Sequence, residues 1–295
     1  MSKPKRHHYN PQFHLSAWSR SDGKVCRFRW VENKLVTDWN TPEHTAFEPD
    51  LYSMENPNSS KNPSLETGFF SPLDSQAALV LRKLVETGVS SLTPGDRDIW
   101  IRYVMSLHTR NPGAVRYIRE TGTTILRQEL SANPEKYESV RQTADPDSLL
   151  EWVKTNLHGS IENFGILHLP ELIDGLPWVQ KRIRRMNWWI RRFEDLAAGL
   201  LISDRPLILR PNAGLQNSKC FIALPLTPKV IFFATSDEKV LEEFLSLEAI
   251  PSIERINAWS VEQAASYVWG ASVDQYDFVQ KKLRKPSIHR NPGIF

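Results

Sequence analysis

The sequence lacks the features that mark membrane, secreted and strongly charged proteins. No stretch of its 295 residues approaches the run of about 18 uncharged apolar residues that a membrane-spanning helix requires. The basic residues Lys3, Lys5 and Arg6 are not followed by an apolar segment, so we expect no secretory signal. The formal net charge is only +3, which by itself predicts no nucleic-acid partner. These absences favour a cytoplasmic protein without a membrane partner.

Cysteine and glycine are also scarce. The two cysteines, Cys26 and Cys220, are too few for a disulfide framework or a zinc site of their own, and their apolar neighbours predict small buried side chains. The 20 prolines outnumber the 13 glycines, which predicts many defined element starts and stiff turns. Glycine-rich phosphate loops and the Gly-x-Ser-x-Gly and His-Glu-x-x-His motifs are absent. The sequence therefore contains no motif for a nucleotide cofactor and does not support the common hydrolase and zinc classes.

The residues that are present indicate a single α+β domain over residues 1–295. Contents of 40% hydrophobic and 24% charged residues are typical of globular proteins. We expect a helical middle region packed on a mostly antiparallel sheet, which is formed by an N-terminal hairpin and the last third of the chain. We expect three parts. Residues 1–65 contain a hairpin at 24–37 and a loop from about 38, and residues 66–176 contain helices that start at Pro72 and Pro94. Residues 177–295 contain strands followed by two helices, the last of which starts at Ser260.

Residues 6–15 are the most informative segment, although termini are usually disordered unless something ties them down. Tyr9, Phe13 and Leu15 give this segment apolar anchors. We expect it to dock on the body of the protein, against the helix that starts at Pro72, because burial of such side chains offsets the entropy of ordering.

The same segment carries the adjacent histidines His7 and His8. Neighbouring side chains in an extended segment point to opposite sides, so at most one of the two faces a given site. A neutral imidazole is a good general base or metal ligand. The alternative is that one histidine bonds to a backbone carbonyl and holds the segment in place.

Further short motifs follow along the chain. They are Ser64-Leu65-Glu66, Arg110 with Pro112, Ser203-Asp204-Arg205-Pro206, Pro225-Leu226-Thr227-Pro228, and Asn257. Together with the pattern from His7 to Leu15, and in this order, they make the sequence resemble the bacterial domain-of-unknown-function family 4238 over nearly its whole length. The sequence departs from that pattern at Asn10, where a branched aliphatic residue is commoner, and at Arg205, where asparagine is common. The resemblance implies homology and no particular activity.

Three carboxylates are candidate metal ligands. Glu66, Asp74 and Asp204 offer the hard oxygen ligands that Mg²⁺ and Mn²⁺ prefer. Asp74 has an alternative role as the third residue of a helix-capping box that begins at Ser71. Asp204 has an alternative role in a turn, where its side chain bonds the backbone. Glu66 precedes the helix and has no equally good structural explanation.

The remaining candidates are basic. Arg110 lies where a helix must stop before Pro112, a place that also favours a cation electrostatically. A second group interleaves with tryptophan, a mixture that suits phosphate neutralisation and base stacking; its members are Lys181, Arg182, Arg184, Arg185, Arg191 and Arg192. The alternative for this group is a solvated basic face over a buried tryptophan.

Two functional hypotheses follow from these residues. The first is a divalent-metal-dependent nuclease or other phosphodiester-acting hydrolase. His7 or His8 would be its base or ligand, with Arg110 in the site. Glu66, with Asp204 or Asp74, would hold the metal, and the basic group would bind the backbone of the nucleic acid. The second is a non-catalytic module of a bacterial regulatory or defence system that binds nucleic acid or protein, in which the motifs are scaffold.

Overall fold

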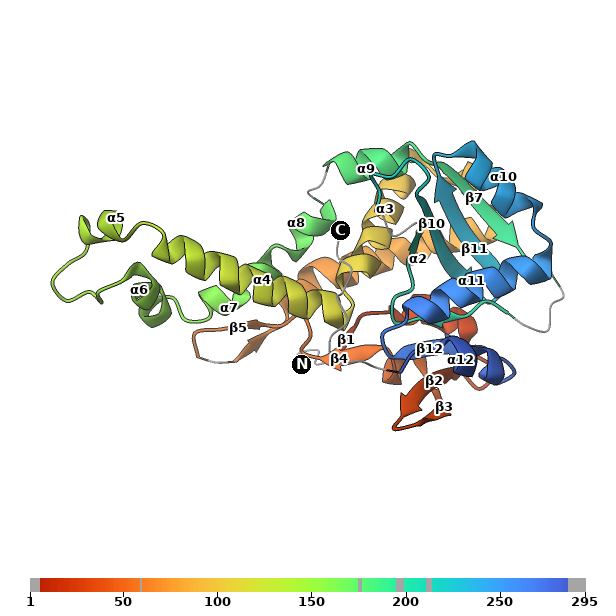
Figure 1. The fold of residues 1–295 in the computed structure, drawn as a ribbon, viewed down its shortest axis with the longest axis horizontal. Helices are drawn as coiled ribbons and strands as arrows, with labels where there is room; N and C mark the ends of the chain where they lie inside the picture. The colour runs from red at the N-terminus through yellow and green to blue at the C-terminus, as the bar shows by residue number, and fades with distance from the viewer. Residues whose placement is uncertain (1–5, 59, 175–176, 195–198, 211–213, 286–295) are drawn as a thin grey trace.

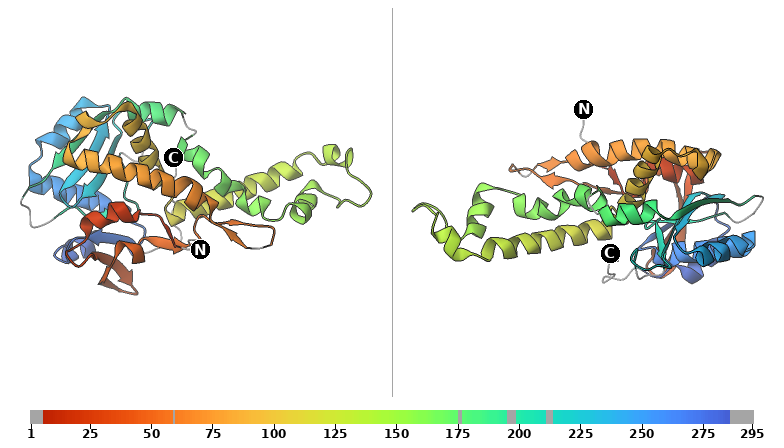
Figure 2. Two further views of the ribbon diagram at one scale, coloured as in Figure 1. Left: turned by 180° about the vertical axis from the view of Figure 1, so that it is seen from behind. Right: turned by 90° about the horizontal axis from the view of Figure 1, so that it is seen from above.

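The computed structural model describes residues 6–58, 60–174, 177–194, 199–210 and 214–285. These residues form a rounded body from which a long helical arm projects (Figures 1 and 2). The body contains two four-stranded antiparallel sheets with the helices α2, α3 and α9 to α12, and the arm contains α4 to α7. Helices and antiparallel strands are both abundant, which confirms the predicted α+β class. Within the described residues, no helix has the length and apolar character needed to cross a membrane.

The first sheet joins the N-terminal hairpin to strands from the last third of the chain. Its order is β3-β2-β12-β8, with β2 (Val25–Val31), β3 (Lys34–Asn40), β8 (Ile202–Ser203) and β12 (Tyr267–Gly270). The hairpin turns at Glu32, which has a φ of 52°, as the sequence indicated. Strand β12 lies between β2 and β8 and so links the two ends of the chain.

The second sheet is built entirely from the last third of the chain. Its order is β7-β11-β10-β9, with β7 (Asn187–Arg192), β9 (Ile208–Arg210), β10 (Phe221–Thr227) and β11 (Val230–Thr235). Alternate residues of β11 face opposite layers. Phe232 packs in the cluster that contains Trp100 of α3, and Phe233 packs in the cluster that contains Phe244 of α10. Because helices cover both faces, β11 is buried along its whole length.

The helices of the body are α1 (Gln12–Leu15), α2 (Ser71–Glu86), α3 (Pro94–Thr109), α8 (Leu169–Asp174), α9 (Pro177–Arg184), α10 (Glu238–Ser246), α11 (Ala249–Gln263) and α12 (Tyr276–Lys282). Of these, α2 and α3 begin where the sequence indicated. Thr93 and Asp96 form the capping box of α3. The prediction of a helix starting at Ser260 was wrong. Ser260 lies near the end of α11, and its hydroxyl donates to the backbone oxygen of Leu201.

The arm depends on a close crossing of two helices. It consists of α4 (Pro112–Ser131), α5 (Pro134–Glu138), α6 (Leu149–Asn156) and α7 (Ser160–Leu167). A Cβ atom on Gly165 would lie 2.1 Å from the backbone oxygen of Ile118, and one on Gly122 would lie 2.2 Å from the Cα of Gly165. Glycine at both positions therefore lets the backbones of α4 and α7 touch.

The region predicted as a loop from residue 38 contains short regular elements. They are β4 (Phe47–Pro49), the hairpin of β5 (Met54–Glu55) and β6 (Lys61–Asn62), and the short helices η2 (Pro42–His44) and η3 (Glu66–Phe70). Strand β5 contacts α7 at the base of the arm, where Asn163 donates to the backbone oxygen of Glu55 and accepts from its N–H, both at 2.8 Å. This loop is therefore a structured bridge between the N-terminal segment and the arm.

The N-terminal segment docks on the body, as predicted. Arg6–His8 forms β1, which pairs with β4, and α1 contacts α2. Tyr9 and Leu15 are buried in the main core, and the ring of Phe13 lies 5.5 Å from that of Tyr103 on α3. The segment thus packs against both α2 and α3.

Candidate functional site

His7 and His8 point to opposite sides of β1, as expected for neighbours in a strand. The ring of His7 stacks on Tyr52 with centroids 5.4 Å apart, and its Nδ1 accepts from the Tyr52 N–H at 2.9 Å. On the other side, His8 lies with Nε2 3.3 Å from the Glu43 backbone oxygen and Nδ1 3.4 Å from Nε2 of Gln12. Burial lowers the pKa of His8, so the ring is neutral and donates to Glu43. Both histidines are buried and hold the segment in place.

Tyr52 connects the N-terminal segment to the end of α3. Its side chain is fully buried, and its hydroxyl donates to the backbone oxygen of Arg110 at 2.8 Å. Its ring lies 4.4 Å from that of Phe70, at the end of η3. The charges of Arg110, Glu66 and Asp74 all act on its hydroxyl. Tyr52 therefore lies at the centre of a polar cluster that His7 contacts from the other side.

Arg110 is the core of this cluster. Its side chain has an exposure of 0%, and its Nη1 donates to Oδ1 and Oδ2 of Asp74 at 2.9 and 3.2 Å. The rings of Phe70 and Tyr103 lie 5.7 and 5.6 Å from the guanidinium carbon. The Tyr103 hydroxyl also interacts with the guanidinium, but within the described part of the chain Nε and Nη2 make no hydrogen bond of normal geometry. Apart from the contact with Tyr103, the buried guanidinium thus has donor capacity on Nε and Nη2 that the described residues do not fill.

Asp74 does not cap its helix, contrary to the alternative drawn from the sequence. The π-helix η3 runs directly into α2, so the amides near Ser71 are already inside a continuous helix and α2 has no side-chain cap. The carboxylate is instead free to pair with Arg110. Burial raises the pKa of Asp74, while the positive charge of Arg110 acts in the opposite direction.

Glu66 lies on the π-helix beside this ion pair. Its side chain is half-buried, and its Oε2 has no hydrogen-bond partner in the described residues. Burial raises the pKa of Glu66 to about 7; Arg110 opposes this effect and Asp74 adds to it. A carboxyl group with this pKa exchanges its proton near neutral pH. Single π-helical turns frequently occur at functional sites.

Asp204 does not belong to the cluster around Arg110, and its carboxylate has a structural role. Its carboxylate accepts the backbone N–H groups of Ala265, Ser266 and Tyr267 at 2.7, 2.7 and 3.0 Å. Burial raises its pKa, and these three hydrogen bonds oppose the rise. Its charge also acts on Tyr9. Asp204 thus fixes the connection between α11 and β12. Its role is structural, but its hydrogen bonds join a distant segment of the chain instead of its own turn.

The three predicted metal ligands therefore do not converge. Glu66 and Asp74 lie beside Arg110, whereas Asp204 has a different environment. Among the described residues there is no group of three or more His, Cys, Asp or Glu side chains that could hold a metal ion. Asp204 is therefore not the partner of Glu66 at a metal site, because its oxygens are occupied by backbone amides, and Asp74 is the carboxylate that lies near Glu66.

The predicted basic group is partly used by the fold. Arg191 donates to the backbone oxygens of Phe244 and Leu247 after α10, and Arg192 to those of Leu84 and Val85 in α2.

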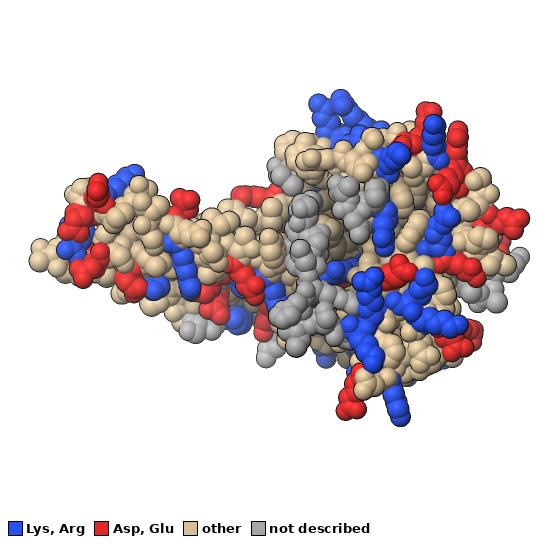
Figure 3. Space-filling view, in the orientation of Figure 1, with Lys and Arg blue, Asp and Glu red and all other residues tan. Residues whose placement is uncertain are grey.

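The other four members of the group lie on or next to α9. Arg184 pairs with Asp98 of α3, and Arg182 donates to Asn217. Lys181 and Arg185 are exposed. Basic side chains gather above α9 in Figure 3, whereas basic and acidic side chains alternate along the arm. Two of the six residues predicted for a nucleic-acid interface, Arg191 and Arg192, thus bond to the backbone of the fold, and the other four lie at α9.

Sequence reasoning missed the residues that support the cluster. Fully buried His14 contacts the Tyr103 hydroxyl through Nδ1 and the Pro225 backbone oxygen through Nε2, both at 2.8 Å. Burial lowers the pKa of His14 to about 4, so the ring is neutral; Nε2 donates and Nδ1 accepts from Tyr103. Tyr103 then presents only lone pairs to Arg110. Neither His14 nor Tyr52 had a local pattern that distinguished it, since their partners are distant in sequence.

The resemblance predicted from the short sequence motifs agrees with a comparison to known families. A family model described as "Protein of unknown function (DUF4238)" matches residues 6–274, nearly the whole chain. The chain belongs to this family. A search of curated proteins and solved structures finds no match. The matched range includes His7, Glu66, Asp74, Arg110 and Asp204, so the family is defined over both the polar cluster and the connection fixed by Asp204.

Proposed function

We propose that the protein hydrolyses phosphodiester bonds, with its reaction centre at Glu66, Asp74 and Arg110. One observation carries the proposal: apart from a contact with Tyr103, a buried arginine has unfilled donor capacity on Nε and Nη2, beside a carboxyl group whose pKa is about 7. The Nε and Nη2 edge of a guanidinium presents two parallel donors, which match two oxygens of a phosphate group. Glu66 and Asp74 are partly exposed, so the cluster reaches the surface through them.

Glu66 has the properties of a proton-transfer residue. A general base works best when its pKa lies near the operating pH, and burial brings the pKa of Glu66 there. In this proposal, Glu66 removes a proton from the water that attacks phosphorus, and Arg110 stabilises the charge that develops on the phosphoryl oxygens. His7 and His8 act as positioning residues, because their nitrogens contact Tyr52, Glu43 and Gln12.

A divalent cation fits this proposal through two carboxylates. Mg²⁺ is commonly held by one or two carboxylates together with the phosphates of the substrate, so it does not require three protein ligands. Glu66 and Asp74 are the pair that would hold Mg²⁺ or Mn²⁺, and with the cation bound Glu66 would serve as a ligand instead of the base. The cation would polarise the phosphoryl group when bound.

The exposed cations of α9 suit a polymeric substrate. Arg184 of α9 pairs with Asp98, which lies twelve residues before Arg110 along α3, or about 18 Å at 1.5 Å per residue. Lys181 and Arg185 are therefore too far away to touch the phosphate at Arg110. They lie at a distance suited to phosphates several nucleotides away, which favours nucleic acid over a small phosphodiester.

Cleavage assays with matched variants test the proposal. Purified protein is incubated with single- and double-stranded DNA and with RNA, each with Mg²⁺, with Mn²⁺ and with a chelator. Glu66→Gln replaces the carboxyl group with a neutral side chain of the same shape. Glu86→Gln is the control, because Glu86 is exposed at the other end of α2. We expect cleavage by the wild type and by Glu86→Gln, and a loss of at least about 100-fold in Glu66→Gln.

Two results would contradict the proposal. One is the absence of cleavage of every nucleic acid by folded wild-type protein under all three conditions. The other is an equal rate for the wild type and Glu66→Gln, which would place the reaction away from this cluster.

A non-catalytic binding module is the second candidate, and the full burial of Arg110 favours it. In this reading the ion pair of Arg110 with Asp74 only fixes α2 to the end of α3. Breaking a buried pair by removing one partner typically costs about 3–5 kcal/mol. If Asp74→Ala lowers stability by that amount and the wild type cleaves nothing, the binding module is the better description.

A further inference from the structure

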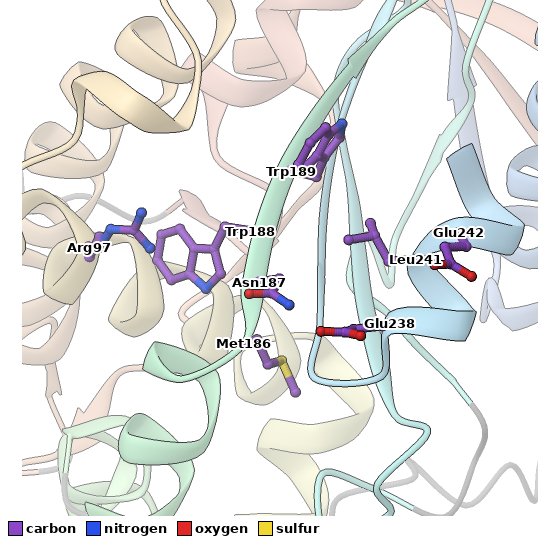
Figure 4. Close-up of a pocket in the computed structure, with 8 residues that line it drawn as sticks. All are labelled: Arg97, Met186, Asn187, Trp188, Trp189, Glu238, Leu241 and Glu242. Atoms are coloured by element: carbon purple, nitrogen blue, oxygen red, sulfur yellow. The ribbon is translucent and has the colours of Figure 1, made fainter. Parts of the chain in front are cut away.

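A groove of 560 Å³ runs along the outer edge of the second sheet, around strand β7. Figure 4 shows its two sides. Trp188 points from β7 toward Arg97 of α3, whereas Trp189 points from the opposite face, the side on which α10 presents Glu238, Leu241 and Glu242. None of these residues belongs to the cluster around Arg110, so the groove is independent of the proposed hydrolase.

Strand β7 is an edge strand. It pairs with β11 on one side, and no strand of the described part of the chain lies on its other side. Its second half approaches the short helix η4 (Val89–Ser91), which leaves the half from Asn187 to Trp189 beside the groove. The outer N–H and C=O groups of an edge strand are a template on which an extended peptide can add as a further strand.

The side chains on the α10 side of the groove select for positive charge. The side chain of Trp189 is 45% exposed, although tryptophan is usually largely buried. Glu238 and Glu242 lie four residues apart on α10, are exposed, and make no ion pair within the described residues. The one cation that lines the groove, Arg97, lies 4.7 Å above the ring of Trp188 on the other face of the strand. An indole face beside two carboxylates is a good receptor for a lysine or arginine side chain.

We propose that this groove binds an extended basic segment of a partner protein, which adds to β7 as a strand and places a lysine or arginine side chain over Trp189. The backbone of β7 supplies hydrogen bonds that do not depend on sequence. Glu238 and Glu242 supply the preference for positive charge, and Leu241 packs against the apolar part of the bound side chain. Because the half of β7 beside the groove runs from Asn187 to Trp189, a peptide of about six residues is long enough to pair with it.

Binding of short labelled peptides tests the proposal directly. The probe is a fluorescein-labelled peptide of sequence Arg-Val-Arg-Val-Arg-Val, and the comparison peptide has glutamate in place of arginine. Fluorescence anisotropy measures the Kd of each with the full-length protein. We expect the basic peptide to bind at least about tenfold more tightly than the acidic one, with a difference that shrinks as salt is added.

Variants locate the binding site. Trp189→Ala, and separately the double substitution Glu238→Gln with Glu242→Gln, should each weaken binding of the basic peptide by about fivefold or more. Trp178→Ala is the matched control, because Trp178 on α9 is 44% exposed and lies outside the groove. It should leave Kd unchanged. A melting curve for each variant confirms that it is folded.

A modified peptide tests the strand addition itself. N-methylation of alternate residues removes the N–H donors on one edge and blocks pairing with β7, while charge is retained. We expect this peptide to lose binding at least about tenfold. Equal binding of the methylated peptide, equal binding of the acidic peptide, or an unchanged Kd in Trp189→Ala would overturn the proposal, as would a basic peptide that does not bind.

Discussion

Replacement of Glu66 by glutamine should change how the stability of the protein depends on pH. Burial raises the pKa of Glu66 from 4.5 to about 7, so between these pH values the folded state holds a proton that the unfolded state has lost. The free energy of unfolding therefore falls as pH rises through this window. The contribution is fully present below pH 4.5 and is lost as pH rises through 7.

The magnitude follows from the shift of about 2.5 pH units, which corresponds to at most about 3.4 kcal/mol. Because Glu66 keeps part of its contact with solvent, water screens the interaction, and we expect about 2 kcal/mol between pH 5 and pH 8. The Glu66→Gln variant stays neutral throughout. It should therefore gain about 2 kcal/mol over the wild type when the pH is raised.

Urea unfolding at pH 5 and pH 8, followed by tryptophan fluorescence, measures this difference. Other titrating groups are common to the wild type and the variant, so their contributions cancel when the two pH changes are compared. Glu86→Gln, exposed on the same helix, should behave as the wild type does. If the wild type and Glu66→Gln change by the same amount, the carboxyl group is not held protonated by its surroundings, and its proposed role as a base near neutral pH fails with it.

Two further substitutions and one deletion test the structural roles. Asp204→Ala leaves three backbone N–H groups without their acceptor, so it should lower the free energy of unfolding by about 3 kcal/mol or more in urea titrations; an unchanged midpoint would refute the structural role. Gly165→Ala places a Cβ 2.1 Å from the Ile118 backbone oxygen and should increase hydrogen exchange across α4 and α7, whereas Gly95→Ala, with 3.9 Å of space, should not. Deletion of residues 1–15 removes Tyr9 and Leu15 from the core and should lower Tm by several degrees in a thermal scan; an unchanged Tm would mean that the segment is peripheral.

The fold was predictable where local patterns and packing agree. The hairpin at residues 24–37 could be found because alternating strand residues flank Glu32 and Asn33, and β11 because its apolar run suits a strand that is covered on both faces. Ser260 misled the prediction, since a Ser-x-x-Gln pattern is the same inside a helix as at its start. Only the contact with Leu201, 59 residues away, shows which of the two it is.

The candidate site was predictable only in part, for the same reason. Glu66 and Arg110 belong to short motifs and could be named, but their proximity depends on how η3 meets the end of α3. Tyr52 has no motif at all, and its role comes from contacts to residues 45 and 58 positions away. A sequence identifies which residues can carry charge, whereas the fold decides which of them share one environment.

The hydrogen bonds of the motif residues separate scaffold from candidate chemistry. Asp204 accepts three amides from a distant segment, and Asn257 bonds both the Leu201 N–H and the Gly199 oxygen. The donors and acceptors of these side chains are used in hydrogen bonds that join parts of the chain, and this structural role is sufficient to explain why Asp and Asn occur at these positions. Arg110 and Glu66 differ, since the described structure leaves Oε2 of Glu66 without a hydrogen-bond partner and gives Nε and Nη2 of Arg110 no contact beyond Tyr103. Burying unpaired polar atoms costs free energy, and a bound phosphate or water that pairs with them would recover it. Among the motif residues, the cluster around Arg110 is therefore where a bound ligand would recover the most free energy.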